Sequence, residues 1–140
     1  MNVVEVIWHP LFRRWFEDLL KESPEIAGEI MALLVALEEH GTEPGDPESH
    51  PVVTSGCRLR ALRRTPPTSV TPYAVDPPVL RVLYGFVADR EQLKAVALYG
   101  GDKTTLRSRW YPPALLEAER RLITMCGRMG LEIRRLTIST

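Results

Sequence analysis

Arg81 is an isolated charge within residues 79–88, where two sets of alternating apolar side chains predict a β-strand buried on both faces. A charge on such a strand costs free energy unless an opposite charge pairs with it or it opens onto a surface that the fold needs. Other cations and a phenol occur in neighbouring predicted elements: Arg60, Arg63, Lys103 and Tyr111. On one sheet face with Arg81, they could orient a phosphodiester and offset charge during in-line displacement, without a metal ion. The alternative is that Arg81 pairs with an acid across the sheet and the other cations are solvated.

The common catalytic and ligand-binding motifs are missing from the sequence. It has no GxGxxG, GxxxxGK[ST], HExxH, CxxC or GxSxG pattern. The histidines at positions 9, 40 and 50 have no cysteine or carboxylate at ligand spacing, so we expect no metal and no cofactor. Glu117 and Glu119 are interpreted as a solvated helix face. Cys57 and Cys126 fit neither a metal site nor a disulfide framework, so we expect two free thiols in a reducing cytosol.

The net charge of zero conceals an uneven distribution. Residues 1–50 contain 3 basic and 11 acidic residues, whereas residues 51–140 contain 15 basic residues, 13 of them arginine, and 7 acidic ones. Arginine binds phosphate with two donors and stacks on flat rings, so this bias favours RNA, DNA or another polyanion as a partner. The alternative is that acidic helices lie beside a basic remainder within one fold.

Length and hydropathy predict one globular domain over residues 1–140, because 140 residues with 44% hydrophobic content can form one core but not two ordinary ones. No apolar run approaches the roughly 20 residues that span a bilayer. The first fifteen residues lack a basic segment ahead of a continuous apolar stretch, which argues against a secretory signal. We therefore expect a cytoplasmic protein with no membrane partner.

The apolar periodicity predicts the order β-α-α-β-β-β-α. The expected elements are a strand over 2–8, helices from Pro10 and from Ser23 to Gly41, strands over 57–64, 79–88 and 93–99, and a helix over 114–128. Ser23 is predicted to cap its helix with its hydroxyl, and Leu59 and Leu62 suggest a bulge in their strand. Residues 65–78, with five prolines, and 100–109 are predicted loops, and 131–138 are consistent with one more strand. The fold class is α+β, with an N-terminal strand and two-helix hairpin packed on a small, mainly antiparallel sheet, and a C-terminal helix.

Four features, in this order, resemble the HigB/RelE toxins of type II toxin–antitoxin systems (the RelE/ParE superfamily). Those toxins typically read ELR, then yRvly, then an apolar strand ending in KKT. The corresponding segments here are LRALR (59–63), LRVLY (80–84) and VALYGGDKT (96–104), with Asp102 at a usually basic position. The family often has a proline followed by an alanine six and an arginine nine positions later, matched by Pro112, Ala118 and Arg121. The resemblance extends from Val3 to about Arg121.

The resemblance implies a ribosome-dependent mRNA endoribonuclease, or mRNA interferase, that inhibits translation and growth. The 2′-hydroxyl of the RNA would attack the adjacent phosphate, with no metal. Arg81 would grip the scissile phosphate, and Lys103 would stabilise the transition state or protonate the leaving 5′-oxygen. Arg63 and Tyr111 complete the expected catalytic set, Tyr111 by analogy with a tyrosine that stacks on a base. The residues expected to contact RNA are Arg58, Arg60, Arg64, Arg107 and Arg109.

The same resemblance implies binding partners and leaves two alternative functions open. A cognate antitoxin, of the helix-turn-helix, HigA-like kind, would neutralise the toxin and would mediate any contact with operator DNA. The ribosome and mRNA would be the targets. The alternatives are a ParE-like inhibitor of gyrase with the same fold, and a non-catalytic module that binds nucleic acid or an antitoxin.

Overall fold

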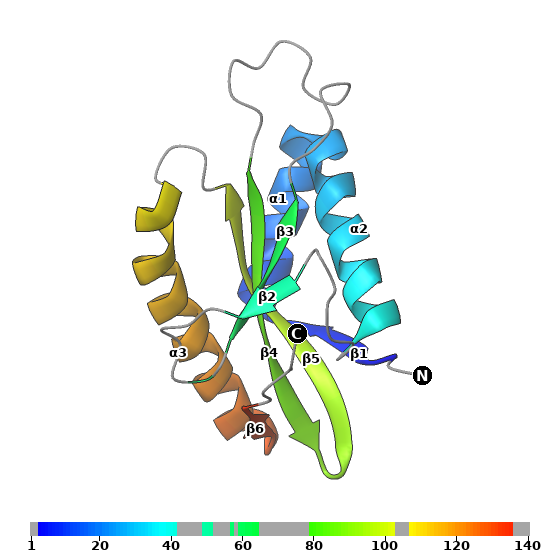
Figure 1. Cartoon of the computed structure of the whole chain (residues 1–140), viewed down its shortest axis with the longest axis vertical. Helices are drawn as coiled ribbons and strands as arrows, with labels where there is room; N and C mark the ends of the chain where they lie inside the picture. Colours follow the sequence, from blue (N-terminus) through cyan, green and yellow to red (C-terminus); the bar gives the residue numbers. More distant parts are fainter. Residues whose placement is uncertain are drawn as a thin grey trace.

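The computed structural model describes residues 3–41, 49–51, 57, 59–64, 79–102 and 107–135 (Figure 1). Its elements are β1 (Glu5–Trp8), α1 (Pro10–Glu22), α2 (Pro24–His40), β2 (Ser49–Pro51), β3 (Arg60–Arg64), β4 (Leu80–Asp89), β5 (Gln92–Asp102), the 3-10 helix η1 (Arg107–Trp110), α3 (Tyr111–Met129) and β6 (Glu132–Arg134). The predicted α+β class is confirmed and the predicted elements occur in the expected order, but β2 is an additional strand that the sequence did not predict. Among these helices, none has the length and apolar character needed to cross a membrane.

The sheet is mixed, and its strands follow the order β1-β5-β4-β3-β2. β4 and β5 form the expected antiparallel hairpin, and β3 pairs antiparallel with the first half of β4. β6 pairs with Phe86–Ala88, beyond the part of β4 that β3 covers. β1 lies parallel to β5, with Glu5 opposite Lys94 and Trp8 opposite Ala97. β4 is therefore the central strand, as its two apolar faces predict.

The sheet lies between two layers of helix, with α1 and α2 on one face and α3 on the other (Figure 1). Successive side chains of β4 point to opposite faces of the sheet. Those that pack with α1 and α2 are Leu80, Val82, Tyr84 and Phe86, and those that pack with α3 are Leu83 and Val87. The α1–α2 side is held by Phe12 and Phe16, both buried and both in edge contact with Trp8. Burial on both faces explains why the strand shows no polar stripe.

Two adjacent glycines in β5 allow both helical layers to approach the sheet closely. A Cβ on Gly100 would collide with the indole of Trp15 from α1, and a Cβ on Gly101 would lie 2.9 Å from Nε1 of Trp110. Because Gly100 and Gly101 have no side chains, Trp15 packs against one face of β5 and Trp110 against the other. The sequence predicts a loop at these residues, whereas β5 continues through Asp102.

Several boundaries differ from the predicted ones. Ser23 occupies the N-cap position of α2, but its side chain makes no capping hydrogen bond, so that prediction is wrong. α3 begins at Tyr111 rather than 114, because prolines in its first turn are compatible with helix. Gly41 ends α2 with a φ of 57°, as expected of a glycine. The predicted loop over 65–78 lies outside the described residues.

Candidate active site

Arg63 and Arg81 face each other across neighbouring strands. The register places Arg63 of β3 directly opposite Arg81 of β4. Arg81 alternates with Leu80 and Val82, so both arginines point to the face that α3 covers. Arg63 is exposed, whereas Arg81 is only 7% exposed. Two like charges at opposed positions destabilise a sheet, and the destabilisation is relieved when an anion lies between them.

The guanidinium of Arg81 is held by neutral oxygens. Its Nε donates to the hydroxyl of Tyr111 at 3.1 Å and its Nη1 donates to the carbonyl of Leu80 at 2.8 Å. Within the described residues no carboxylate pairs with it. The alternative of an acid across the sheet therefore finds no support there. A buried cation with no paired charge costs free energy that a bound anion would offset.

Tyr111 reaches Arg81 because of where α3 begins. It is the first residue of α3, and its ring lies 5.2 Å from that of Trp110 in an edge-to-face contact. Trp110 is buried, and Gly101 makes room for it on the sheet. The hydrogen bond between Arg81 and Tyr111 therefore depends on the start of α3 and on Gly101, which lets Trp110 approach the sheet. The predicted proximity of Tyr111 and Arg81 is confirmed.

Asp102, at the usually basic position, has a structural contact. It is the last residue of β5, opposite Leu80, and its Oδ1 accepts a hydrogen bond from the backbone N–H of Val79 at 2.9 Å. This bond secures the start of β4 next to Arg81. Lys103 follows directly in the chain and lies outside the described residues.

Arg60 does not join this cluster, contrary to the expectation that it shares a face with Arg81. Its neighbours Leu59 and Ala61 pack on the α3 side, so Arg60 points the other way. There its Nε donates to the hydroxyl of Tyr84 at 3.2 Å, and Arg60 is 5% exposed. The expectation that Arg60 lies on the same face as Arg81 is therefore wrong, and its predicted contact with RNA stays a prediction.

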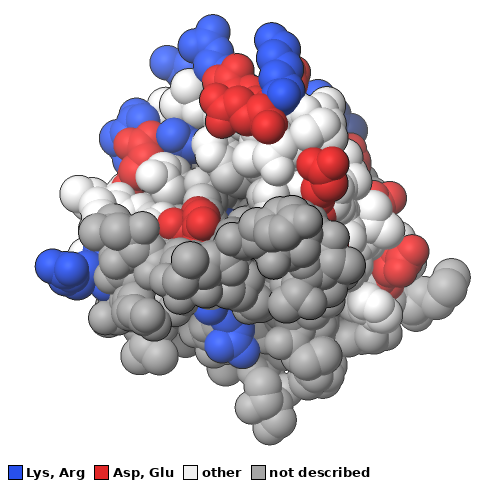
Figure 2. Space-filling model, turned by 90° about the horizontal axis from the view of Figure 1, so that it is seen from above, with Lys and Arg blue, Asp and Glu red and all other residues white. Residues whose placement is uncertain are grey.

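The remaining predicted RNA contacts are only partly described. Arg109 is exposed on η1, near the start of α3. Arg64 ends β3 and Arg107 begins η1, but their side chains are not among the described ones, and neither is any part of Arg58. Seen from above, basic and acidic side chains lie beside one another on the described surface (Figure 2). Among the described residues on this face, the acidic first part and the basic second part of the sequence therefore do not form separate acidic and basic surfaces.

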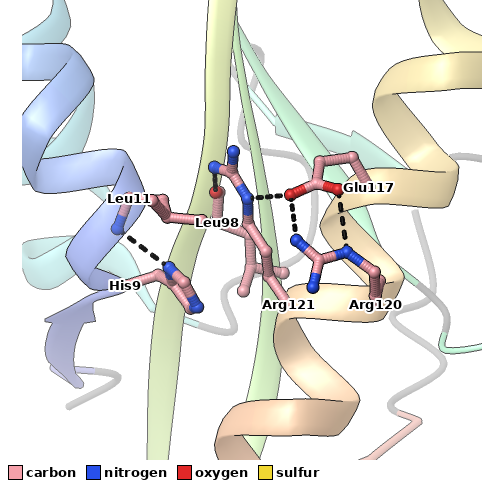
Figure 3. A network of polar contacts seen from close by, with 6 residues as sticks. All are labelled: His9, Leu11, Leu98, Glu117, Arg120 and Arg121. Carbon is pink, nitrogen blue, oxygen red and sulfur yellow. Dashed lines mark hydrogen bonds and ion pairs between the residues drawn. The ribbon is translucent and has the colours of Figure 1, made fainter.

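A second polar network, not predicted from the sequence, links α3 to β5 (Figure 3). Glu117 accepts two hydrogen bonds from Arg120 and one from Nε of Arg121 at 2.6 Å. The hydrogen bonds from Arg120 and Arg121 lower the pKa of the Glu117 carboxyl to about 2. Glu117 is therefore an ion-pair partner rather than part of a purely solvated face. The i, i+3 and i, i+4 spacing was the signal available in the sequence.

Arg121 also bonds to the backbone of β5. Its Nη1 donates to the carbonyl of Leu98 at 2.7 Å, and its guanidinium lies over the ring of Tyr99, 5.1 Å from the centroid. Leu98 is the extra residue of a bulge, since Leu83 pairs with Tyr99 and the next residue of β4 pairs with Ala97. Arg121 thus supplies a donor to the carbonyl at the bulge of β5.

The described residues contain no group of three or more histidine, cysteine or acidic side chains that could hold a metal ion. Cys57 and Cys126 are free and buried on the α3 side, and burial raises the pKa of both thiols. No protein-family model, curated protein or solved structure matches this chain. The candidate site therefore rests on its own geometry.

Proposed function

We propose that this chain is the toxin of a type II toxin–antitoxin system and cleaves mRNA on the ribosome. The observation that carries the proposal is the buried guanidinium of Arg81, which has a tyrosine hydroxyl and a carbonyl as partners, and Arg63 opposite it. Such a pair of cations fits the two non-bridging oxygens of a phosphodiester. The order of the resembling segments supports the same proposal, because they fall on three neighbouring strands, β3, β4 and β5.

The proposed reaction is an internal transesterification. The 2′-hydroxyl oxygen attacks the adjacent phosphorus, and the bond from phosphorus to the 5′-oxygen breaks. The products are a 2′,3′-cyclic phosphate and a 5′-hydroxyl end, with one proton leaving the 2′-oxygen and one reaching the 5′-oxygen. Arg81 would stabilise the charge that accumulates on the non-bridging oxygens. Tyr111 is a positioning residue, because its hydroxyl fixes the orientation of the Arg81 guanidinium. Lys103 is proposed to protonate the leaving oxygen or to stabilise the same charge.

The decisive experiment compares induced wild-type protein with Arg81→Ala and Arg81→Lys. Loss of one donor that stabilises a transition state costs roughly 100-fold in rate. We expect both variants to lose growth arrest and the new 5′-hydroxyl ends mapped on translated messages. Chelation of transition metals at constant Mg²⁺, which the ribosome itself needs, should leave cleavage by purified wild-type protein on ribosomes unchanged. Both variants should still co-purify with the antitoxin, the expected product of a small helix-turn-helix reading frame beside this one.

Three outcomes would contradict the proposal. Unchanged cleavage in the Arg81 variants would remove Arg81 from the site. Growth arrest accompanied by a DNA-damage response, without cuts in translated RNA, would assign the chain to the gyrase inhibitors. Antitoxin binding without any growth arrest by the wild-type protein would leave a non-catalytic module.

A further inference from the structure

A pocket of about 320 Å³ lies away from Arg81, between the start of α1 and the C-terminal half of α3. Its polar lining includes His9 from the α1 side and Arg120, Arg121 and Arg128 from α3. Its apolar lining includes Met125 and Met129 of α3. About 15 Å of helix axis separates Tyr111 from Arg121, at 1.5 Å per residue, so the pocket is distinct from the candidate active site.

The pocket carries positive charge. Three arginines line it and no carboxylate does. Glu117 lies outside the lining and neutralises one charge of the Arg120–Arg121 pair (Figure 3). Arg128 is exposed and makes no ion pair with any described residue. The pocket therefore retains a positive charge, which favours an anion.

His9 adds a directed donor. Its Nδ1 accepts a hydrogen bond from the backbone N–H of Leu11 at 3.0 Å, as Figure 3 shows. The neutral ring therefore carries its proton on Nε2, which donates to no described residue. Burial, followed by the charges of the three arginines, lowers the pKa of His9, and of the charged groups that act on it only Glu117 opposes them. A bound anion would counter the arginine charges.

We propose that this pocket binds a nucleotide, with the phosphate held by Arg128, Arg121 and Nε2 of His9 and the base against Met125 and Met129. Phosphate is the anion that arginine clusters recognise with several donors. The volume is within the roughly 300–1,000 Å³ typical of small-molecule pockets, and a mainly apolar wall with a few convergent polar groups is their usual lining. Methionine offers a soft, adaptable surface to a flat ring. The nucleotide is either free or part of an RNA strand. The proposal does not depend on RNA cleavage.

The test is a titration of the full chain with three probes, in which binding is measured by calorimetry and by NMR of the His9 ring. The probes are adenosine 5′-monophosphate, inorganic phosphate and a 2′-O-methyl RNA hexamer, which lacks the attacking hydroxyl. We expect saturable binding of the mononucleotide, at least tenfold tighter than that of phosphate alone. The pKa of His9 should rise on binding, because a dianion favours the imidazolium. A hexamer that binds tighter than the mononucleotide, changes the His9 ring signals and loses affinity in Arg128→Ala identifies an RNA strand as the source. A hexamer that does not change the His9 ring, or binds weaker than the mononucleotide, identifies a free nucleotide.

Matched variants locate the binding. Arg128→Ala removes an exposed side chain and should weaken mononucleotide binding at least fivefold. His9→Asn keeps a residue that caps helices well but removes the imidazole, and should weaken binding about as much. Arg14→Ala, an exposed arginine on α1 outside the pocket, should leave it unchanged. Equal affinity in wild type and Arg128→Ala, phosphate binding as tightly as the mononucleotide, or no change at the His9 ring would overturn the proposal. Growth arrest and RNA cleavage are separate readouts, so either proposal can fail alone.

Discussion

Arg63 and Arg81 lie directly opposite each other on β3 and β4, on the face that α3 covers. Their charges repel each other in the folded protein when no ligand is bound. Arg63→Ala should therefore raise the free energy of unfolding at low salt by a few tenths to about 1 kcal/mol. The gain should vanish in high salt, which screens exposed charges. Chemical denaturation at two salt concentrations measures it.

The same variant should respond less to polyanions. If the opposed arginines bind phosphates, then a single-stranded oligonucleotide should raise the melting temperature of the wild type more than that of Arg63→Ala. An equal shift in both proteins would mean that the anion binds elsewhere. Arg134→Ala, which removes an exposed arginine of β6, serves as the control.

Two tyrosine–arginine pairs on opposite faces of the sheet give a matched comparison. Tyr111→Phe and Tyr84→Phe each delete one hydroxyl that accepts from an arginine Nε. Tyr84 is 1% exposed, so loss of its hydroxyl should cost about 1–3 kcal/mol of stability, because the buried Nε of Arg60 loses the acceptor of this hydrogen bond. Tyr111 is only half-buried and should cost less. Cleavage should fall in Tyr111→Phe and persist in Tyr84→Phe at a temperature where both are folded.

The Glu117 network predicts a pH-dependent contribution to stability. Its folded-state pKa of about 2 lies below the usual 4.5, so the stabilisation is fully present above pH 4.5 and is lost as the pH falls toward 2. Glu117→Gln should lower the free energy of unfolding by about 1 kcal/mol at pH 7, since Arg120 is exposed and Glu117 is partly exposed, so solvent weakens the ion pair. The difference from wild type should shrink between pH 4.5 and pH 2 in urea titrations. Glu39→Gln, at an exposed position on α2, should show no such trend.

Gly100 should tolerate no side chain while Trp15 remains. Gly100→Ala forces the indole or the strand to move and should cost about 1–3 kcal/mol. In the double variant with Trp15→Leu the alanine should cost much less than it does alone, because the contact that it violates is gone. Thermal or chemical denaturation of the four proteins measures the coupling. Strictly additive losses would show that Trp15 is not the obstacle.

The sequence predicted the fold correctly where a residue pattern was compatible with only one structure. The two alternating apolar sets of β4 predicted a central strand, the hairpin with β5 and the side on which Arg81 lies. β3 was ambiguous, since both of its faces are covered and apolar and basic residues occur on each, so Arg60 was assigned to the wrong face. The bond from Arg121 to Leu98 depends on a bulge in β5 and on the packing of α3 against that strand. Neither is a local property of the sequence, so this contact needed coordinates.

The parallel pairing of β1 with β5 also determines the order of assembly. β1 has its sheet neighbour near position 95, so it is synthesised long before the strand with which it pairs. The α1–α2 hairpin can form early, but its apolar side has no sheet to cover until β3, β4 and β5 exist. Closure of this long loop is entropically slow, which places the docking of the N-terminal segment late in folding. During synthesis the nascent chain therefore carries an unsatisfied hydrophobic surface, and a chaperone or a pre-existing partner that covers it would act in that interval.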